Sequence, residues 1–175
     1  SGQEYLGDGQ NVAHIYADAV FSQEVGLNTF NKFNVDAGKI ANMYFKKENG
    51  TQWVNNLVNV VNDRINVNGT VNAIQNSKIG GNLIFLSKDG FAVGKSGVVN
   101  AGSLSVMTPT SEYFVKAGLA SWADGATEDV ANGAIDFINI FGANESHIDI
   151  DAFQKTFLVN NWAEIKSMNV PINKT

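Results

Sequence analysis

The chain contains no cysteine among its 175 residues and only two prolines. The absence of cysteine excludes disulfides, thiolate chemistry and metal sites with cysteine ligands. Arginine is almost absent too, with Arg64 as its one instance, and the formal net charge is −5. A nucleic-acid-binding protein needs a basic stripe to neutralise phosphates, and anionic membranes attract the same kind of cluster. The sequence therefore argues against both of these partners.

Charged residues are scarce, at 17% of the chain, and they are unevenly distributed. Residues 1–110 carry eight acidic and eight basic side chains, whereas residues 111–175 carry nine acidic and four basic ones. The C-terminal third thus accounts for the whole net charge. No run of about 18 apolar residues predicts a membrane-spanning helix.

Asparagine and glycine take the place of the missing charges, with 23 and 17 residues respectively. Both residue types tolerate positive φ angles at tight corners. The hydrophobic content of 44% is too high for a disordered chain. This composition predicts a single folded domain that turns often and stacks short strands.

The most informative stretch is residues 79–109, in which three short apolar strands are separated by glycine corners. We expect these strands at Asn82–Leu86, Phe91–Val93 and Ser103–Met107. Ile65–Val67, Leu83–Leu86 and Leu104–Val106 also recur about every 20 residues, which is typical of a solenoid. Each coil would then lie about 4.8 Å above the previous one. The fold class that we predict is mainly β, a parallel β-helix.

Upstream, alternating apolar residues in Val12–Val20 and Ile40–Phe45 predict half-buried strands, and Thr29–Val35 is an aromatic-rich strand candidate. Trp53–Ile65 admits two interpretations. Its apolar residues fall at helical spacing, which favours an amphipathic helix. However, its four valines and four asparagines are mediocre helix formers, and a clear strand–turn–strand follows it. We favour a strand.

The pattern changes after Pro109. A cap and an acidic first turn at Thr127–Val130 precede apolar residues at helical spacing, and Asp151–Lys166 is a second amphipathic helix candidate. We expect residues 111–169 to form an acidic, partly helical excursion on the side of the solenoid. Residues 170–175 would begin the next coil, so the chain would be a fragment of a longer protein.

Candidate catalytic groups are few. His14 and His147 stand alone, without the spacing of metal ligands. Asp63 and Asp89 are the only carboxylates between Asn49 and Thr110, although a β-helical polysaccharide lyase or hydrolase would gather several. No nucleophile elbow, phosphate loop or dinucleotide fingerprint is present. We therefore expect a protein that is not an enzyme and that has no metal or cofactor.

The three tryptophans, Trp53, Trp122 and Trp162, allow two roles. Exposed aromatic rings can serve as platforms on which carbohydrate rings stack. Tryptophan more often anchors a hydrophobic core, because its large apolar surface is best removed from water. We favour the core role for these residues.

An ordered series of short motifs resembles a known family. The series runs through Asn68-Gly-Thr70, Gly81-Asn-Leu-Ile-Phe-Leu86, Ser87-Lys-Asp-Gly-Phe91, Ala92-Val-Gly94 and Val99-Asn-Ala-Gly-Ser103. It is similar to the N-terminal secretion domain of the filamentous haemagglutinin family, and within it to leukotoxin-like filamentous adhesins. Gram-negative bacteria export these proteins by two-partner (type Vb) secretion. The resemblance covers residues 28–110, and Val170–Asn173 matches a family junction.

Two family motifs differ in this chain. The Asn-Pro-Asn-Gly-Ile turn of the family is here Ser87–Phe91, which keeps the glycine and its polar neighbour but lacks the proline. The upstream Asn-Pro-Asn-Leu motif is missing, and Glu48–Gly50 stands near its expected place.

The resemblance implies a right-handed parallel β-helix with an N-terminal β cap. In this division, residues 1–47 form the cap and first strands, residues 48–110 the coils and residues 111–169 the excursion. It also implies a non-catalytic secretion signal and folding nucleus of a large secreted adhesin or leukotoxin-like exoprotein. Its partner would be an outer-membrane transporter with periplasmic polypeptide-transport domains, and its destination the cell surface or the medium. The residues that this implies for recognition or turn formation are Asn49, Gly50, Asn68, Gly69, Ser87, Lys88, Asp89, Gly90, Asn100 and Gly102.

Two other functions stay open at this point. The acidic segment 111–170 could bind a host glycan or protein at the cell surface, which would make the chain a binding module of an adhesin. Alternatively, the chain could be a polysaccharide-active β-helix that uses Asp63 or Asp89.

Overall fold

The computed structural model describes residues 11–21, 24–87, 89–94 and 96–107. These residues contain thirteen strands and no helix. The strands form a parallel β-solenoid of about three turns, which confirms the predicted fold class. The predicted helices and the return to a strand at residues 170–175 lie outside the described residues, as do His147, Trp122 and Trp162.

Each complete coil contributes three strands in the same order. Coil 1 comprises β3 (Val25–Phe30), β4 (Asn34–Val35) and β5 (Ile40–Tyr44). Coil 2 comprises β6 (Asn56–Val61), β7 (Ile65–Val67) and β8 (Thr70–Gln75). Coil 3 comprises β10 (Asn82–Ser87), β11 (Phe91–Val93) and β12 (Val98–Asn100), and β13 (Ser103–Met107) begins a fourth coil.

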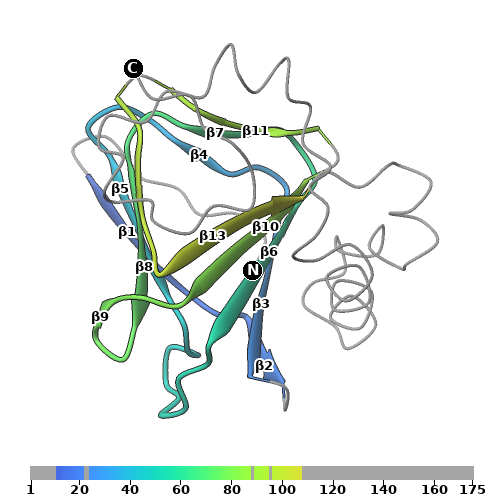
Figure 1. The fold of residues 1–175 in the computed structure, drawn as a ribbon, viewed down its shortest axis with the longest axis vertical. Helices are drawn as coiled ribbons and strands as arrows, with labels where there is room; N and C mark the ends of the chain where they lie inside the picture. The colour runs from blue at the N-terminus through green and yellow to red at the C-terminus, as the bar shows by residue number, and fades with distance from the viewer. Residues whose placement is uncertain (1–10, 22–23, 88, 95, 108–175) are drawn as a thin grey trace, which may run out of the picture.

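The coils stack into three sheets that enclose a triangular core (Figure 1). Sheet A has the order β1-β5-β8-β12, with β9 (Lys78–Ile79) paired to β8. Sheet B has the order β13-β10-β6-β3-β2, and sheet C has the order β11-β7-β4. All neighbours from one coil to the next are parallel, so each main chain bonds to the coil before it and the coil after it.

Two strands precede coil 1, within the segment predicted as the cap. β1 (Val12–Tyr16) extends sheet A by pairing in parallel with β5. β2 (Ala19–Phe21) folds back and pairs antiparallel with β3, at the end of sheet B. An antiparallel strand at this position breaks the parallel series and covers the edge of β3.

The repeat is less regular than the sequence pattern predicted. Leu83 lies opposite Leu104 in the next coil and opposite Leu57 in the preceding one, and the second interval is the longer of the two. Ile65–Val67 does not belong to this series, because it pairs with Phe91–Val93 in sheet C. The coils vary in length because their corners vary, and β9 with its turn adds residues to coil 2 alone. The predicted repeat of about 20 residues placed strands of sheets B and C in one series, so its first interval does not measure the length of a coil.

The interior is apolar, with a row of aromatic rings between sheets B and C. Phe33 packs edge-on against Phe30 and Phe85, with ring centroids 5.2 and 5.3 Å apart, and Phe85 lies 5.3 Å from Phe91. All four side chains are buried. Trp53 is half-buried and packs against this core, as expected for a core anchor.

Sheet B is apolar on both faces. Leu57 and Val61 of β6 point into the core, whereas Val58 and Val60 point outward and are nevertheless 0% exposed. Leu86 of β10 is also 0% exposed. Burial on both faces explains why Trp53–Ile65 mimics helical spacing: its apolar residues do not alternate. The strand that we favoured there is confirmed as β6.

Candidate functional site

Most of the described residues that are implied for recognition lie at the three corners of the triangle or at one outlying turn. We name the corners by the sheets that they join. Ser87, Asp89 and Gly90 form the BC corner of coil 3, and Asn68 and Gly69 form the CA corner of coil 2. Gly102 lies at the AB corner after coil 3. The structure therefore does not bring these residues together into one site.

The CA corner is a stack of glycine-containing turns. The N–H groups of Asn68 and Gly69 both donate to the carbonyl oxygen of Val35 in coil 1, at 2.7 and 2.9 Å. A Cβ atom at Gly69 would collide with the carbonyl oxygens of Asp36 and Lys39. Gly69 in turn accepts a 2.9 Å hydrogen bond from the N–H of Val98 in coil 3. Only glycine fits between two main chains at this spacing.

At the BC corner one serine side chain and the main chain bond to coil 2. Ser87 is fully buried, and its hydroxyl donates to the carbonyl oxygen of Asp63 at 2.8 Å and accepts from the N–H of Asp89 at 3.3 Å. Gly90, at φ +103°, accepts a 3.0 Å hydrogen bond from the N–H of Ile65. Lys88 lies outside the described residues. This turn thus docks one coil on another without the proline of the family motif.

The remaining predicted residues have separate environments. Gly102 packs against the backbone of Gly81, and the next residue, Ser103, donates its N–H to the Gly81 carbonyl oxygen at 3.0 Å. Asn49 and Gly50 lie in the turn that follows β5, closed by a 3.0 Å hydrogen bond from the Gly50 N–H to the Lys47 carbonyl oxygen. Asn100 is the last residue of β12, before the AB corner.

Asn100 belongs to a ladder of asparagines on the outer face of sheet A. The three members, Asn42, Asn72 and Asn100, are opposite one another in β5, β8 and β12. The Nδ2 of Asn100 donates to the Oδ1 of Asn72 at 2.9 Å, and the Nδ2 of Asn72 donates to the Oδ1 of Asn42 at 3.0 Å. Identical amides at matching positions satisfy each other only when the strands are in register.

Sheets B and C carry similar ladders. On sheet B, the Nδ2 of Asn82 donates to the Oδ1 of Asn56 at 3.0 Å, and the hydroxyl of Ser103 donates to the Oδ1 of Asn82 at 2.6 Å. On sheet C, the Nδ2 of Asn66 donates to the Oδ1 of Asn34 at 2.9 Å. Many asparagines that the composition assigned to tight corners therefore lie within strands.

One asparagine pair lies fully inside the molecule. Asn28 and Asn59 are 0% exposed, and the Nδ2 of Asn28 donates to the Oδ1 of Asn59 at 3.1 Å. The Nδ2 of Asn59 then donates to the carbonyl oxygen of Ile84 in coil 3 at 3.1 Å. The Oδ1 of Asn28 accepts from the N–H of Asp18 at 3.1 Å. This chain of bonds links β1–β2, coil 1, coil 2 and coil 3.

Sequence reasoning missed these ladders, although a signal was present. Asn42, Asn72 and Asn100 follow one another at nearly equal intervals, each close to the length of one coil. The signal becomes visible only when the coil length is known. The arrangement can fix strand register, and nothing in its chemistry activates a nucleophile or a water molecule.

The comparisons with known proteins leave the function to be argued from this geometry. No family model, curated protein or solved structure matches the chain. Among the described residues, no group of three or more histidine and acidic side chains could hold a metal ion. That same part of the chain has no helix with the length and apolarity needed to cross a bilayer.

We predict that Gly69→Ala destabilises the fold by about 1–3 kcal/mol, because the new methyl group has to displace two main-chain carbonyls. Chemical denaturation followed by circular dichroism measures the loss. Gly80→Ala is the matched control, since a Cβ there would meet its nearest atom at 3.6 Å, an ordinary contact. We expect the control to change stability by less than about 0.5 kcal/mol. Equal losses in the two variants would contradict the close approach at the CA corner.

We also predict that Asn59→Ala costs about 1–3 kcal/mol, because it leaves the buried amide of Asn28 without its acceptor. Asn66→Ala is the control, since its partner Asn34 is exposed and can bond to water. In a double-mutant cycle, Asn28→Ala combined with Asn59→Ala should cost less than the sum of the two single variants. Additive losses would show that the buried bond does not couple the coils.

Proposed function

We propose that this chain is the N-terminal secretion-signal and folding-nucleation domain of a large secreted adhesin or leukotoxin-like exoprotein. An outer-membrane transporter with periplasmic polypeptide-transport domains would recognise the chain while it is unfolded. The chain would cross the periplasm and the outer membrane, and fold as a monomer at the cell surface. In this role it catalyses no reaction and binds no nucleic acid.

The observation that carries the proposal is that the parallel stack continues beyond its third coil. β13 pairs with β10 in the same way that β10 pairs with β6, with Leu83 between Leu57 and Leu104. A coil that has formed presents main-chain N–H and C=O groups to the next coil, as in other stacked repeats. A domain built in this manner can serve as the template for a long shaft.

The sheet A ladder gives each coil a side-chain partner in the coil before it. Each amide donates to the coil before it: Asn100 to Asn72, and Asn72 to Asn42. The buried pair runs in the other direction, from Asn28 of coil 1 to Asn59 of coil 2. The amide bonds therefore specify which residues of successive coils are opposite each other, as a growing stack requires, and they do so in either direction.

Recognition of an unfolded chain also agrees with the composition. An extended segment can add to the sheet of a partner through main-chain hydrogen bonds. The chain has no cysteine, so no disulfide can lock it in the oxidising periplasm before it crosses the outer membrane. The two alternative functions gain no specific support. The segment that would bind a host glycan or protein, residues 111–170, lies outside the described residues. For a polysaccharide-active enzyme, the candidate Asp63 already uses its Oδ1 to accept a 2.8 Å hydrogen bond from the Arg64 N–H.

Export of a reporter tests the proposal. The chain is fused in front of a reporter protein and co-expressed with a two-partner transporter in a Gram-negative host, and the reporter is measured in the medium. We predict that deletion of Asn68–Val106 abolishes export, because it removes the motif series that the transporter would read. Export of the deletion variant at the level of the intact chain would refute the proposal.

A folding variant separates recognition from folding. Asn59→Ala disturbs the folded core, but Asn59 lies outside the residues implied for recognition, so this variant should be exported at the normal level. The exported variant should then be more sensitive to protease than the intact chain, with Asn66→Ala as the control. Loss of export in Asn59→Ala, with normal export of Asn66→Ala, would show that the folded domain, and not the unfolded segment, is recognised.

A further inference from the structure

An aromatic pair lies on the outer face of sheet A, at its β1 end. Tyr16 of β1 and Tyr44 of β5 are opposite each other in register, and their rings stack with centroids 4.4 Å apart and planes 9° apart. The Nδ1 of His14 lies 2.8 Å from the Tyr44 hydroxyl oxygen, within hydrogen-bond distance. Burial, and then the neighbouring Tyr16, raise the pKa of Tyr44, so its hydroxyl keeps its proton to a higher pH than that of a free tyrosine. Tyr44 thus covers one face of the half-buried Tyr16 ring.

A lysine holds the adjacent turn in place. The Nζ of Lys46 donates to the carbonyl oxygens of Lys47, Glu48 and Gly50, at 3.4, 3.2 and 3.1 Å. The same ammonium lies 5.4 Å from the centroid of the Tyr16 ring, within the range of a cation–π interaction. The carbonyl oxygen of Lys46 accepts a 2.9 Å hydrogen bond from the N–H of Ala17. The turn is therefore fixed against the end of β1.

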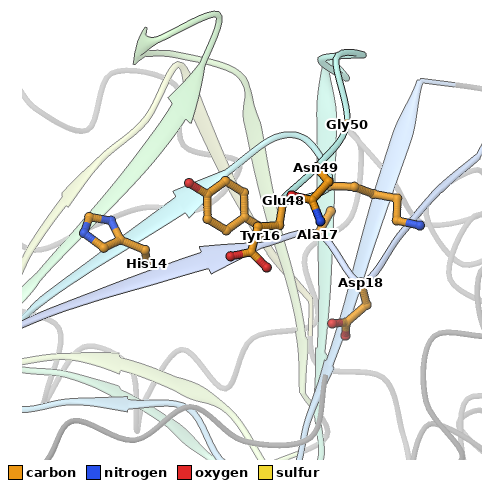
Figure 2. Close-up of a pocket in the computed structure, with 8 residues that line it drawn as sticks. His14, Tyr16, Ala17, Asp18, Glu48, Asn49 and Gly50 are labelled. Atoms are coloured by element: carbon orange, nitrogen blue, oxygen red, sulfur yellow. The ribbon is translucent and has the colours of Figure 1, made fainter.

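Between this turn and β1 lies a hollow of about 700 Å³. Figure 2 shows Tyr16 between His14 and the turn that carries Glu48 and Asn49. Most of the lining is polar and two members carry carboxylates; the residues are His14, Tyr16, Ala17, Asp18, Lys47, Glu48, Asn49 and Gly50. The ammonium groups of Lys46 and Lys47 balance these carboxylates in formal charge.

We propose that this hollow binds a neutral saccharide. The C–H face of a pyranose ring would lie on Tyr16, and its hydroxyl groups would bond to the exposed side chains of His14, Glu48 and Asn49. A sugar ring has an apolar face, which suits the aromatic ring of Tyr16. The hydroxyl groups on its rim both donate and accept hydrogen bonds, and the neighbouring polar side chains include donors and acceptors. The hollow lies within the usual range of about 300–1,000 Å³ for ligand pockets, roughly enough for a disaccharide.

Other ligand classes fit less well. A purely aromatic ligand needs apolar walls, but of the eight described residues that line the hollow only Tyr16 and Ala17 are apolar. An ionic ligand needs an excess of opposite charge, and the lysines and carboxylates around the hollow cancel. The proposed site is a surface of the folded chain, so it is independent of how the unfolded chain is exported.

The test applies the complete 175-residue chain to an array of immobilised neutral oligosaccharides of hexoses and N-acetylhexosamines. We expect binding to at least one of them, weakened about five- to tenfold by Tyr16→Ala, which removes one stacking contact. Tyr16→Phe keeps the ring and should bind as the unaltered chain does. Asn49→Ala, in an exposed turn, should also weaken binding.

Two controls keep the outcome decisive. Ile79→Ala removes an apolar side chain that is 49% exposed on β9, outside the hollow, and should leave binding unchanged. Thermal unfolding of each variant shows whether the fold is retained. If Tyr16→Ala unfolds the edge of the sheet, Asn49→Ala decides between the outcomes. Absence of binding to every neutral oligosaccharide, or equal binding by the folded Asn49→Ala variant, would overturn the proposal.

Discussion

Parallel pairing in a constant register is the constraint on which this structure depends. A parallel strand can satisfy its N–H and C=O groups only if the coil above repeats the path of the coil below. A slip of one residue would turn every core side chain outward and bring the buried Asn28 and Asn59 out of reach of each other. A stable fold therefore needs contacts that specify which residues of successive coils are opposite each other.

The chain uses two kinds of such contacts, and they act at different places. Glycines act at the corners: Gly69 lets the CA corner approach the main chain of coil 1 so closely that no side chain fits. Amide ladders act within the strands, where Asn42, Asn72 and Asn100 bond only when they are opposite one another. The apolar core alone does not prevent a slip of two residues, because such a slip keeps every core side chain on the inner face. Polar contacts therefore provide the specificity, and apolar contacts provide most of the stability.

The sequence predicts the strands better than their arrangement. Glycine corners and apolar runs locate β10, β11 and β13 within one residue, because each run is short and bounded on both sides. The coil length was wrong for coil 2, since local pattern does not reveal that Ile65–Val67 belongs to sheet C. The asparagine ladders were not predicted at all, because a bond between side chains in successive coils has no local signature. The saccharide site could not be anticipated either: Tyr16 and Glu48 are distant in the sequence and meet only because β1 pairs with β5.

The three sheets differ in what their outer faces can do. Sheet B is buried on both sides, so Val58, Val60 and Leu86 are not available to a ligand of the folded protein. Sheet A instead carries amides, two tyrosines and a histidine on its outer face, all partly or fully exposed. A side chain that points away from the core can differ from coil to coil without disturbing the register, unless it belongs to an amide ladder. Tyr16 lies at the β1 end of sheet A, beyond the asparagine ladder, where this freedom is greatest. A binding function is therefore best placed at this end of the solenoid, while in the proposed function the β13 end is where further coils would add.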